Sequence, residues 1–456
     1  MNPKTALVPF MVFIVLVSCE ASCSNTSWHL SFPTCGKTSQ DTQSLFIPYQ
    51  FSLWDLAPKK GKGVRIVMLD TGIAGYEFQG DSHYSKHPEL DACYDPAWGC
   101  LSIVKHEHYK AHFKTYEVCP LCLPAIRRKD VIKHKRLMHG THAYGLIASK
   151  TFGLAPQAEV IVINMFTTEG TCKVSTLIQA LEKAITLKPD ILLIEANLDQ
   201  NIPQDCPAIQ RIVSLCSQVP WVIVPAGNNG EHKHGLSQPA GITPEIISVG
   251  AFGIREKHIF VPRFSQREQD KGPDILAPGC DITSTGALFF ENDPGYITLK
   301  GTSSAAAIVT AFIALLLGEF KEKLPKDQLR NIIRHATMQC EPNTTEQSAS
   351  TYGILDMRLA LFIAYILEKE SSVQPNQVKE YLLRPYPINN DWKFLEYELE
   401  KYHQIKKAEK IPHDALQRAI KNCIHHVKEL HQAKHQTKSS DYSPRTRPKD
   451  QPTGGR

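Results

Sequence analysis

An aspartate, a histidine and a serine follow one another along this 456-residue chain, each within a short run of small residues. Asp70 opens the run Asp-Thr-Gly, His139 opens His-Gly-Thr-His, and Ser303 closes Gly-Thr-Ser. A serine hydroxyl is a weak nucleophile near neutral pH until an imidazole accepts its proton, and the imidazole needs a carboxylate to fix its tautomer. We therefore predict that Ser303 is a nucleophile, His139 its general base and Asp70 the residue that orients the base.

The order of these residues distinguishes between unrelated solutions to the same chemistry. α/β-Hydrolases carry Ser, Asp and His, trypsin-like enzymes carry His, Asp and Ser, and subtilisin carries Asp, His and Ser. Other segments match the same group of enzymes as the last order: the Ala-Gly-Asn turn with Asn228, Gly153–Pro156, Asp274–Gly279 and Tyr352–Asp356. On these motifs, the chain resembles the subtilisin-like serine proteases (subtilases) from about residue 45 to about residue 366, and His139–Phe166 looks most like the pyrolysin and site-1-protease branch.

The resemblance implies a serine endopeptidase that hydrolyses peptide bonds through an acyl-enzyme intermediate, with a protein or peptide as substrate. It also implies that the Asn228 side-chain amide and the Ser303 backbone N–H stabilise the negative charge of the tetrahedral intermediate. Ser303 would stand at the start of an Ala-rich helix, whose positive dipole end favours the same charge. This chemistry requires no cofactor.

One segment departs from the pattern of the family. The subtilase strand that pairs with the substrate backbone normally ends in Ser-x-Gly, and the corresponding residues here are Glu195, Ala196 and Asn197. A glutamate at this place could favour basic substrate side chains or could narrow the cleft. Many subtilases also carry a substantial prodomain where this chain has only about 25 residues. These departures support an alternative hypothesis, a catalytically inactive binding protein with a subtilase fold.

Short apolar runs alternate with helical patterns along the matching region. The expected strands are Val64–Leu69, Val160–Met165, Asp190–Glu195, Trp221–Pro225 and Ile246–Gly250. The expected helices are His142–Ser149, Lys173–Leu187, Ile209–Cys216 and the buried helix Ala305–Leu317, which is too short to span a bilayer. Continuous apolar strands are typical of a parallel sheet with helices on both faces. We predict a three-layer α/β/α subtilisin-like fold with a mostly parallel sheet, plus a small helical C-terminal extension.

Composition divides the chain into segments with different roles. We predict a signal peptide (1–19), a linker (20–44), a peptidase domain (45–366) with a Cys/His-rich insertion at about 76–135, a helical extension (367–433) and a disordered basic tail (434–456). Within the extension, helical patterning covers Trp392–Lys410 and Ala415–Ala433. The formal net charge of +5 is small for this length, so we expect no nucleic-acid partner.

The N-terminus has the features of an export signal. Lys4 supplies a positive charge, Ala6–Val17 is an apolar stretch too short to span a bilayer unaided, and Cys19 follows. Leu16–Cys19 resembles a bacterial lipobox, whose cysteine is lipidated, and an ordinary secretory signal cut near Ala21 is the alternative. We predict an exported protein, secreted or membrane-anchored at the cell surface or in the periplasm, with membrane association only through a lipid anchor at Cys19.

Thirteen cysteines in an exported chain suggest disulfides. In the insertion, Cys93 and Cys100 form one close pair, and Cys119 and Cys122 form another. This spacing also fits a four-cysteine zinc site, and histidines stand nearby. Disulfides and a structural zinc ion therefore remain alternatives at this stage.

Overall fold

The computed structural model describes residues 11–13, 53–73, 76–78, 81–85, 100–102, 138–149, 153–166, 170–198, 202–232, 235–255, 258–267, 272–286, 295–338, 353–382, 417 and 420–430. The chain divides into two compact units, Met1–Ala364 and Tyr365–Arg456. All strands of the described residues belong to the first unit.

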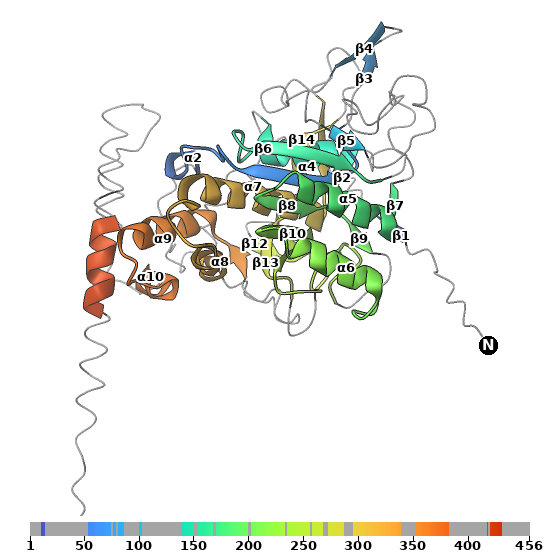
Figure 1. Cartoon of the computed structure of the whole chain (residues 1–456). Helices are drawn as coiled ribbons and strands as arrows, with labels where there is room; N and C mark the ends of the chain where they lie inside the picture. The colour runs from blue at the N-terminus through green and yellow to red at the C-terminus, as the bar shows by residue number, and fades with distance from the viewer. Residues whose placement is uncertain are drawn as a thin grey trace, which may run out of the picture. The chain divides into compact units, whose positions relative to one another are not determined.

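A mostly parallel sheet forms the central layer of the first unit. Its strands lie in the order β16-β17-β13-β11-β10-β8-β2-β6-β5, and β12 pairs with β11 at its side. Figure 1 shows β6, β2, β8 and β10 as neighbours. The parallel strands are β5 (Cys100–Ser102), β6 (Glu159–Asn164), β2 (Arg65–Asp70), β8 (Ile191–Ile194), β10 (Trp221–Pro225), β11 (Ile246–Arg255), β13 (Ile275–Pro278) and β17 (Ile354–Leu355). The antiparallel strands are β16 (Thr337–Met338) and β12 (His258–Phe260).

The side chains of each central strand alternate between two helical layers. Val67 and Leu69 of β2 and Ile194 of β8 share one apolar cluster with α5 (Val174–Thr186) and α6 (Pro207–Cys216). Because neighbouring strand residues point to opposite faces, the residues between them face the other layer. That layer contains α4 (His139–Ala148) and α7 (Thr302–Phe320), which pack against each other.

Helix α7 lies in the core of the first unit. Every residue from Thr302 to Phe320 is buried, and the helix packs against β8, β10, β11 and β13. Among the described residues, α7 is the helix that is long and apolar enough to cross a membrane, and its whole apolar window is buried inside the protein. A helix that is apolar on all sides is typical of the interior of a large domain.

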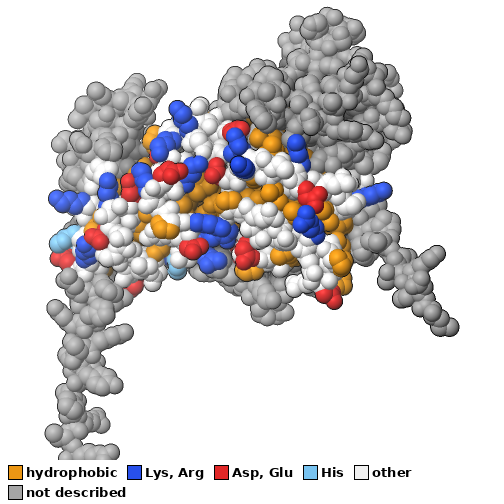
Figure 2. Space-filling view, viewed as in Figure 1, with side chains coloured by type: hydrophobic (Ala, Val, Ile, Leu, Met, Phe, Trp, Pro, Cys, Tyr) orange, Lys and Arg blue, Asp and Glu red, His pale blue; other side chains and the backbone are white. Residues whose placement is uncertain are grey.

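The other described elements of the first unit are short or peripheral. They are α2 (Leu53–Leu56), α8 (Lys326–His335), the hairpins β3 (Tyr76–Phe78) with β4 (Asp81–Ser85) and β14 (Ile282–Thr285) with β15 (Tyr296–Leu299), and the three-stranded sheet β7 (Thr171–Lys173), β1 (Met11–Phe13) and β9 (Asn197–Leu198). On the face in Figure 2, positive and negative side chains of the described residues are interspersed.

The second unit contains helices. Helix α9 (Met357–Lys369) runs across the division between the units, and α10 (Pro375–Leu382) and helical residues 420–430 follow. Glu370 forms an ion pair with Lys428 and accepts a hydrogen bond from Ser372 Oγ at 2.6 Å. The interaction with Lys428, followed by that with Ser372, lowers the pKa of Glu370 to about 2.

The layers confirm the predicted fold class. Helix α4 begins at His139, three residues earlier than the predicted His142, since a contact from a distant loop caps its first turn. Helix α6 begins at Pro207 instead of Ile209, as proline is well tolerated in a first turn. The predicted helix Trp392–Lys410 and most of the insertion lie outside the described residues.

Candidate active site

The last residue of β2 and the first residue of α4 bring Asp70 and His139 together. His139 Nδ1 lies 2.9 Å from each carboxylate oxygen of Asp70. Both residues are buried. When the Nδ1–H donates to the carboxylate, Nε2 carries the lone pair and becomes the atom that can accept a proton. The two side chains therefore have the geometry of a base and its orienting carboxylate.

The turn after β2 also fixes the start of α4. Asp70 Oδ1 accepts the Thr71 N–H at 2.5 Å, and Thr71 Oγ1 accepts the Gly140 N–H at 2.9 Å. A Cβ atom at Gly140 would lie only 2.3 Å from the carbonyl oxygen of Gly72. The small residue after His139 thus permits the close approach of helix and turn. Thr71 was not among the predicted site residues, although its place in the Asp-Thr-Gly run was a signal for it.

Asn228 follows β10 and is tied to the start of α7. Its Oδ1 accepts the Thr302 backbone N–H at 2.8 Å and the Thr302 hydroxyl at 3.0 Å. Gly227, just before it, has a φ of +113°, and a Cβ there would lie 2.2 Å from Gln266 Oε1. Since Oδ1 is turned toward Thr302, the Nδ2 amide group is left as the donor. Thr302 is a second positioning residue that the sequence reasoning missed, although it lies inside the Gly-Thr-Ser run.

Ser303 is the second residue of α7 and is 8% exposed. Its backbone N–H belongs to the first turn of the helix, where N–H groups have no partner within the helix. The contact between α7 and α4 joins the element of Ser303 to that of His139. The positive end of the α7 dipole favours negative charge at this place.

The second histidine of the His-Gly-Thr-His run has a different role. His142 is 2% exposed, and its Nε2 lies 2.9 Å from the carbonyl oxygen of Ile282 in β14. The hydroxyl of Ser284 donates to the His142 carbonyl oxygen at 2.9 Å, also from β14. His142 therefore joins α4 to the β14–β15 hairpin.

Glu195, Ala196 and Asn197 directly follow β8, and all three are buried. Asn197 begins β9, which pairs antiparallel with β1, and β1 in turn pairs antiparallel with β7. The backbone of Met11–Phe13 thus lies between β7, which precedes α5 in the chain, and β9, which follows β8. The two strands accept an extended peptide through main-chain hydrogen bonds, a general mode of peptide recognition.

Five of the described cysteines are reduced thiols, Cys172, Cys206, Cys216, Cys280 and Cys423. Burial raises the pKa of Cys172 and of Cys216 to about 12. Of the four insertion cysteines, Cys93, Cys119 and Cys122 lie outside the described residues, and Cys100 is described only as part of β5. The alternatives of disulfides and zinc stay predictions.

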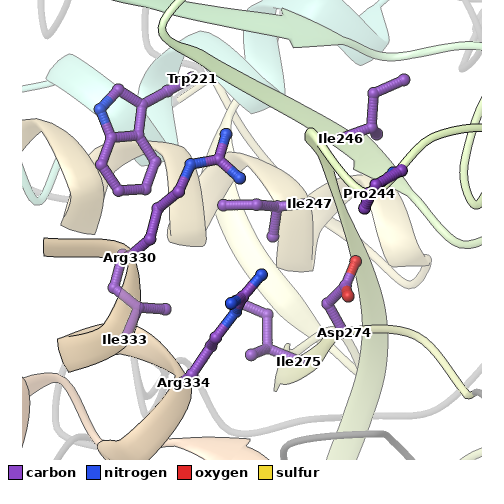
Figure 3. A pocket seen from close by; sticks show the side chains of 9 residues that line it. All are labelled: Trp221, Pro244, Ile246, Ile247, Asp274, Ile275, Arg330, Ile333 and Arg334. Carbon is purple, nitrogen blue, oxygen red and sulfur yellow. The ribbon is translucent and has the colours of Figure 1, made fainter. Parts of the chain in front are cut away.

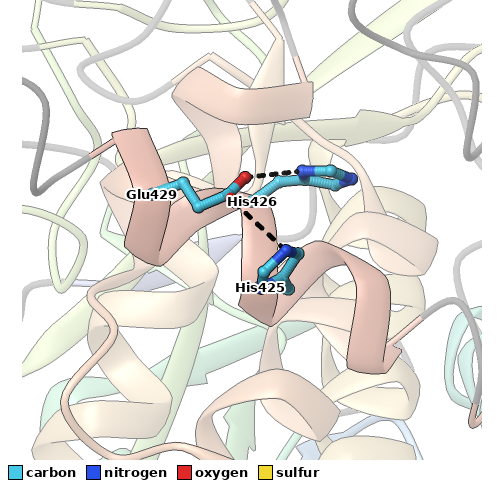
Figure 4. A group of neighbouring side chains, drawn as sticks. All are labelled: His425, His426 and Glu429. Carbon is cyan, nitrogen blue, oxygen red and sulfur yellow. Dashed lines mark hydrogen bonds and ion pairs between the residues drawn. The ribbon is translucent and has the colours of Figure 1, made fainter.

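One group of potential metal ligands occurs among the described residues, in the second unit. His425, His426 and Glu429 lie on one helical segment, with their ligand atoms within 4.8 Å of one another (Figure 4). Each histidine is 3.2 Å from a carboxylate oxygen of Glu429. These groups satisfy one another as exposed intrahelical pairs, as expected for histidines on a solvated face.

A pocket lies at the opposite end of the parallel strands from Asp70 and Asn228. Figure 3 shows Trp221, Ile246 and Ile275, each at the start of its strand, with Arg330 and Arg334 of α8 over them. The Arg330 guanidinium lies 5.1 Å from the Trp221 ring centre and donates to the Glu245 carbonyl oxygen at 2.9 Å. These contacts attach α8 to the sheet.

The fold is that of an α/β protein in which Asp70 ends a strand of the parallel sheet, and His139 and Ser303 lie in the first turns of two helices that pack against each other. The chain belongs to the subtilase family (Peptidase_S8), whose model matches residues 61–354. This match confirms the predicted family.

Several relatives have names that describe serine proteases. An intracellular serine protease of Paenibacillus polymyxa is 32% identical over 188 residues, which cover 39% of this chain and 53% of that protein. The human membrane-bound transcription factor site-1 protease is 27% identical over 259 residues, 53% of this chain and 23% of that protein. Subtilisin Savinase of Lederbergia lenta is 30% identical over 304 residues, 64% of this chain and 88% of that protein. Of the first two, this chain therefore spans about half or less.

Among solved structures, the prenylagaramide maturation protease PagA aligns with a TM-score of 0.48 and 23% identity. The alignment covers 68% of this chain and 98% of that chain.

Proposed function

We propose that the protein is an exported serine endopeptidase that uses Asp70, His139 and Ser303 through an acyl-enzyme intermediate. The hydrogen bond between His139 Nδ1 and the Asp70 carboxylate carries this proposal, because it leaves Nε2 as the base. Membership of a family with many relatives named as serine proteases supports the reaction type. Export rests on the apolar stretch Ala6–Val17.

In the proposed reaction, His139 Nε2 takes the Ser303 hydroxyl proton while the serine oxygen attacks the peptide carbonyl carbon. The carbonyl oxygen becomes negative and receives hydrogen bonds from Asn228 Nδ2 and the Ser303 backbone N–H. His139 then gives its proton to the leaving amine, and the C–N bond breaks to leave an acyl-enzyme. Water, activated by the same imidazole, releases the acid. Side chains and backbone groups suffice for these steps, so we propose no cofactor for them.

The arrangement of β7 and β9 supports a peptide as the substrate. An extended segment of this chain, Met11–Phe13, already pairs with both strands through its backbone. Backbone pairing recognises any extended peptide, and alternate side chains then set the preference.

A fluorophosphonate probe tests the proposed function, because it forms a covalent bond only with an activated serine. We expect labelling of the folded protein at Ser303, identified by mass spectrometry of the labelled peptide, and loss of labelling in Ser303→Ala. The matched control is Ser304→Ala, which removes the neighbouring hydroxyl and keeps the reactive one. Absence of labelling in folded protein at every pH would instead support the alternative, a catalytically inactive binding protein.

A further inference from the structure

Glu195 is the lateral neighbour of Asp70 in the sheet. In the parallel pairing of β2 and β8, Leu69 is in register with Ile194, and the Glu195 N–H donates to the Leu69 carbonyl oxygen at 3.0 Å. Leu69 and Ile194 both face the α5–α6 cluster. The next residue in each chain segment, Asp70 and Glu195, therefore points toward the layer of α4 and α7. Neighbouring strands lie about 4.8 Å apart, so two carboxyl groups share one small region.

The carboxyl group of Glu195 lacks the partners that a buried carboxylate needs. Glu195 is 1% exposed, and neither of its side-chain oxygens has a hydrogen-bond partner of normal geometry among the described residues. Asp70, in contrast, accepts hydrogen bonds from His139 and Thr71. An isolated buried carboxylate is costly, and two carboxyl groups at one site do not both ionise readily.

Burial is the main cause that raises the pKa of Glu195 well above its usual range, and the negative charge of Asp70 adds to the rise. The Ser303 hydroxyl lowers the pKa of Glu195, because it favours the charged form of the Glu195 carboxyl group. The groups that act on Glu195 are thus Asp70 from β2 and Ser303 from α7, and His139 from α4 is hydrogen-bonded to Asp70. Burial beside the Asp70 charge therefore favours the neutral form of Glu195.

Another buried glutamate of the same chain shows what a purely structural role looks like. Glu319 of α7 is 7% exposed, and its Oε1 accepts the Lys59 backbone N–H at 2.6 Å. Its Oε2 lies 4.0 Å from Lys59 Nζ. Glu319 thus ties α7 to the loop after α2. Glu195 makes no such tie, and its surroundings are instead the proposed base–carboxylate pair and the proposed nucleophile.

We propose that Glu195 is a positioning residue of the proposed catalytic group, which allows Ser303 to react while its carboxyl group is neutral and blocks the reaction once it is ionised. The inference rests on the proposed peptidase function. An ionised Glu195 would accept the Ser303 hydroxyl hydrogen and so turn it from His139. It would also repel the negative charge that develops on the substrate oxygen beside Ser303. Rising pH therefore switches the nucleophile off.

The test compares rates of fluorophosphonate labelling from about pH 5 to about pH 10, each protein relative to its own rate at pH 7. The wild-type rate should fall on the alkaline side, approaching about tenfold per pH unit. Glu195→Gln keeps the shape of a neutral acid and has no proton to lose, so its rate should stay level on the alkaline side. Glu319→Gln, the matched change at the other buried glutamate, should retain the alkaline fall.

The infrared spectrum gives an independent readout at neutral pH. A protonated carboxyl band should be present in the wild-type protein and should decrease in Glu195→Gln but not in Ser303→Ala. Identical pH profiles of wild type and Glu195→Gln would overturn the proposal. So would a folded Glu195→Gln protein that does not label at any pH, because a neutral side chain of this shape would then not permit the reaction.

If Glu195→Gln does not fold, Glu195→Asp takes its place. The shorter acid should move the midpoint of the alkaline fall, and an unmoved midpoint would refute a role for this carboxyl group. A wild-type protein that never labels contradicts the proposed function itself, whereas a labelled wild type with an unchanged Glu195→Gln profile contradicts only this inference.

Discussion

At the scale of single residues, the site depends on side chains that are oriented by a hydrogen bond to one of their atoms. Asp70 holds His139 Nδ1, and the Nε2 atom remains for the proton. Thr302 holds Asn228 Oδ1 through two hydrogen bonds, which fixes the orientation of the side-chain amide. In both cases the second partner comes from a distant segment, so orientation is a property of the folded chain.

We expect replacement of Asn228 to slow the chemical step more than substrate binding. Asn228→Leu keeps the size of the side chain and removes the donor, and loss of one oxyanion donor lowers kcat by about 10²- to 10³-fold in a related enzyme. Steady-state kinetics with a peptide substrate measures kcat and KM separately. The control is Asn229→Leu, at the next residue of the turn. A rise of KM with unchanged kcat in Asn228→Leu would contradict the proposed role.

Sequence motifs predicted the four proposed reactive positions because each stands in a short run of small residues that can be recognised from the sequence alone. These positions are Asp70, His139, Asn228 and Ser303. The surroundings of Glu195 could not be predicted in this way. The sequence suggested a glutamate near substrate side chains, whereas the structure buries it beside Asp70. The difference arises from the register of β2 against β8, which depends on contacts between residues about 125 positions apart, as between Arg65 and Asp190.

At the scale of elements, the start of α4 is set by the turn after β2. The helix was expected from residue 142, because the small and polar residues before it have no strong helical pattern. The Thr71 hydroxyl supplies the missing cap from a segment 69 residues away. The lack of a side chain at Gly140 lets the two backbones approach.

Gly140→Ala should separate helix α4 from this turn. The added Cβ would lie 2.3 Å from Gly72 O, against backbone that cannot move easily. Overpacking of this kind costs about 1–3 kcal/mol, and the labelling rate of Ser303 should fall as well because His139 shifts. Chemical denaturation and probe labelling measure the two effects. Gly63→Ala is the control, since its φ of +80° strains the backbone of an alanine but nothing lies within 4 Å of the added atom. An equal loss of labelling in both variants would argue against this explanation.

The pairing of β1 with β7 and β9 predicts an effect of the N-terminal segment. A protein that begins at residue 20 lacks β1, so the backbone groups of β7 and β9 become available to a substrate. We expect it to react faster than the full chain with a peptidyl probe for serines and at the same rate with a small fluorophosphonate. Equal rates of both chains with the peptidyl probe would show that β1 does not compete for this place.

At the scale of the whole molecule, a large core and two units distribute stability unevenly. Helix α7 is buried along its full length in the first unit, and the sheet provides further apolar strands on both of its faces. The three-layer arrangement was predictable from continuous apolar runs, which require cover on both sides. The division after Ala364 falls within helix α9, two residues before the end of the peptidase domain given by the sequence.

Chemical modification of the thiols measures global unfolding. Burial raises the pKa of Cys172 and Cys216 to about 12, so the thiolate form is scarce at pH 8 and iodoacetamide should modify them only on unfolding. Cys206 is partly exposed and should react first in the native protein. Mass spectrometry over increasing denaturant follows all three. Modification of Cys216 as fast as Cys206 without denaturant would contradict the buried position.

The positions of the reacting groups have a consequence for the synthesis of the protein. The carboxylate and the imidazole emerge early from the ribosome, whereas the serine at position 303 appears only after about two thirds of the 456 residues have been made. When the chain has been made only as far as His139, strand β2 still lacks its neighbours β6 and β8, which are translated later. Nascent chains shorter than 303 residues therefore lack the proposed nucleophile, and the proposed activity can begin only after most of the first unit has been made.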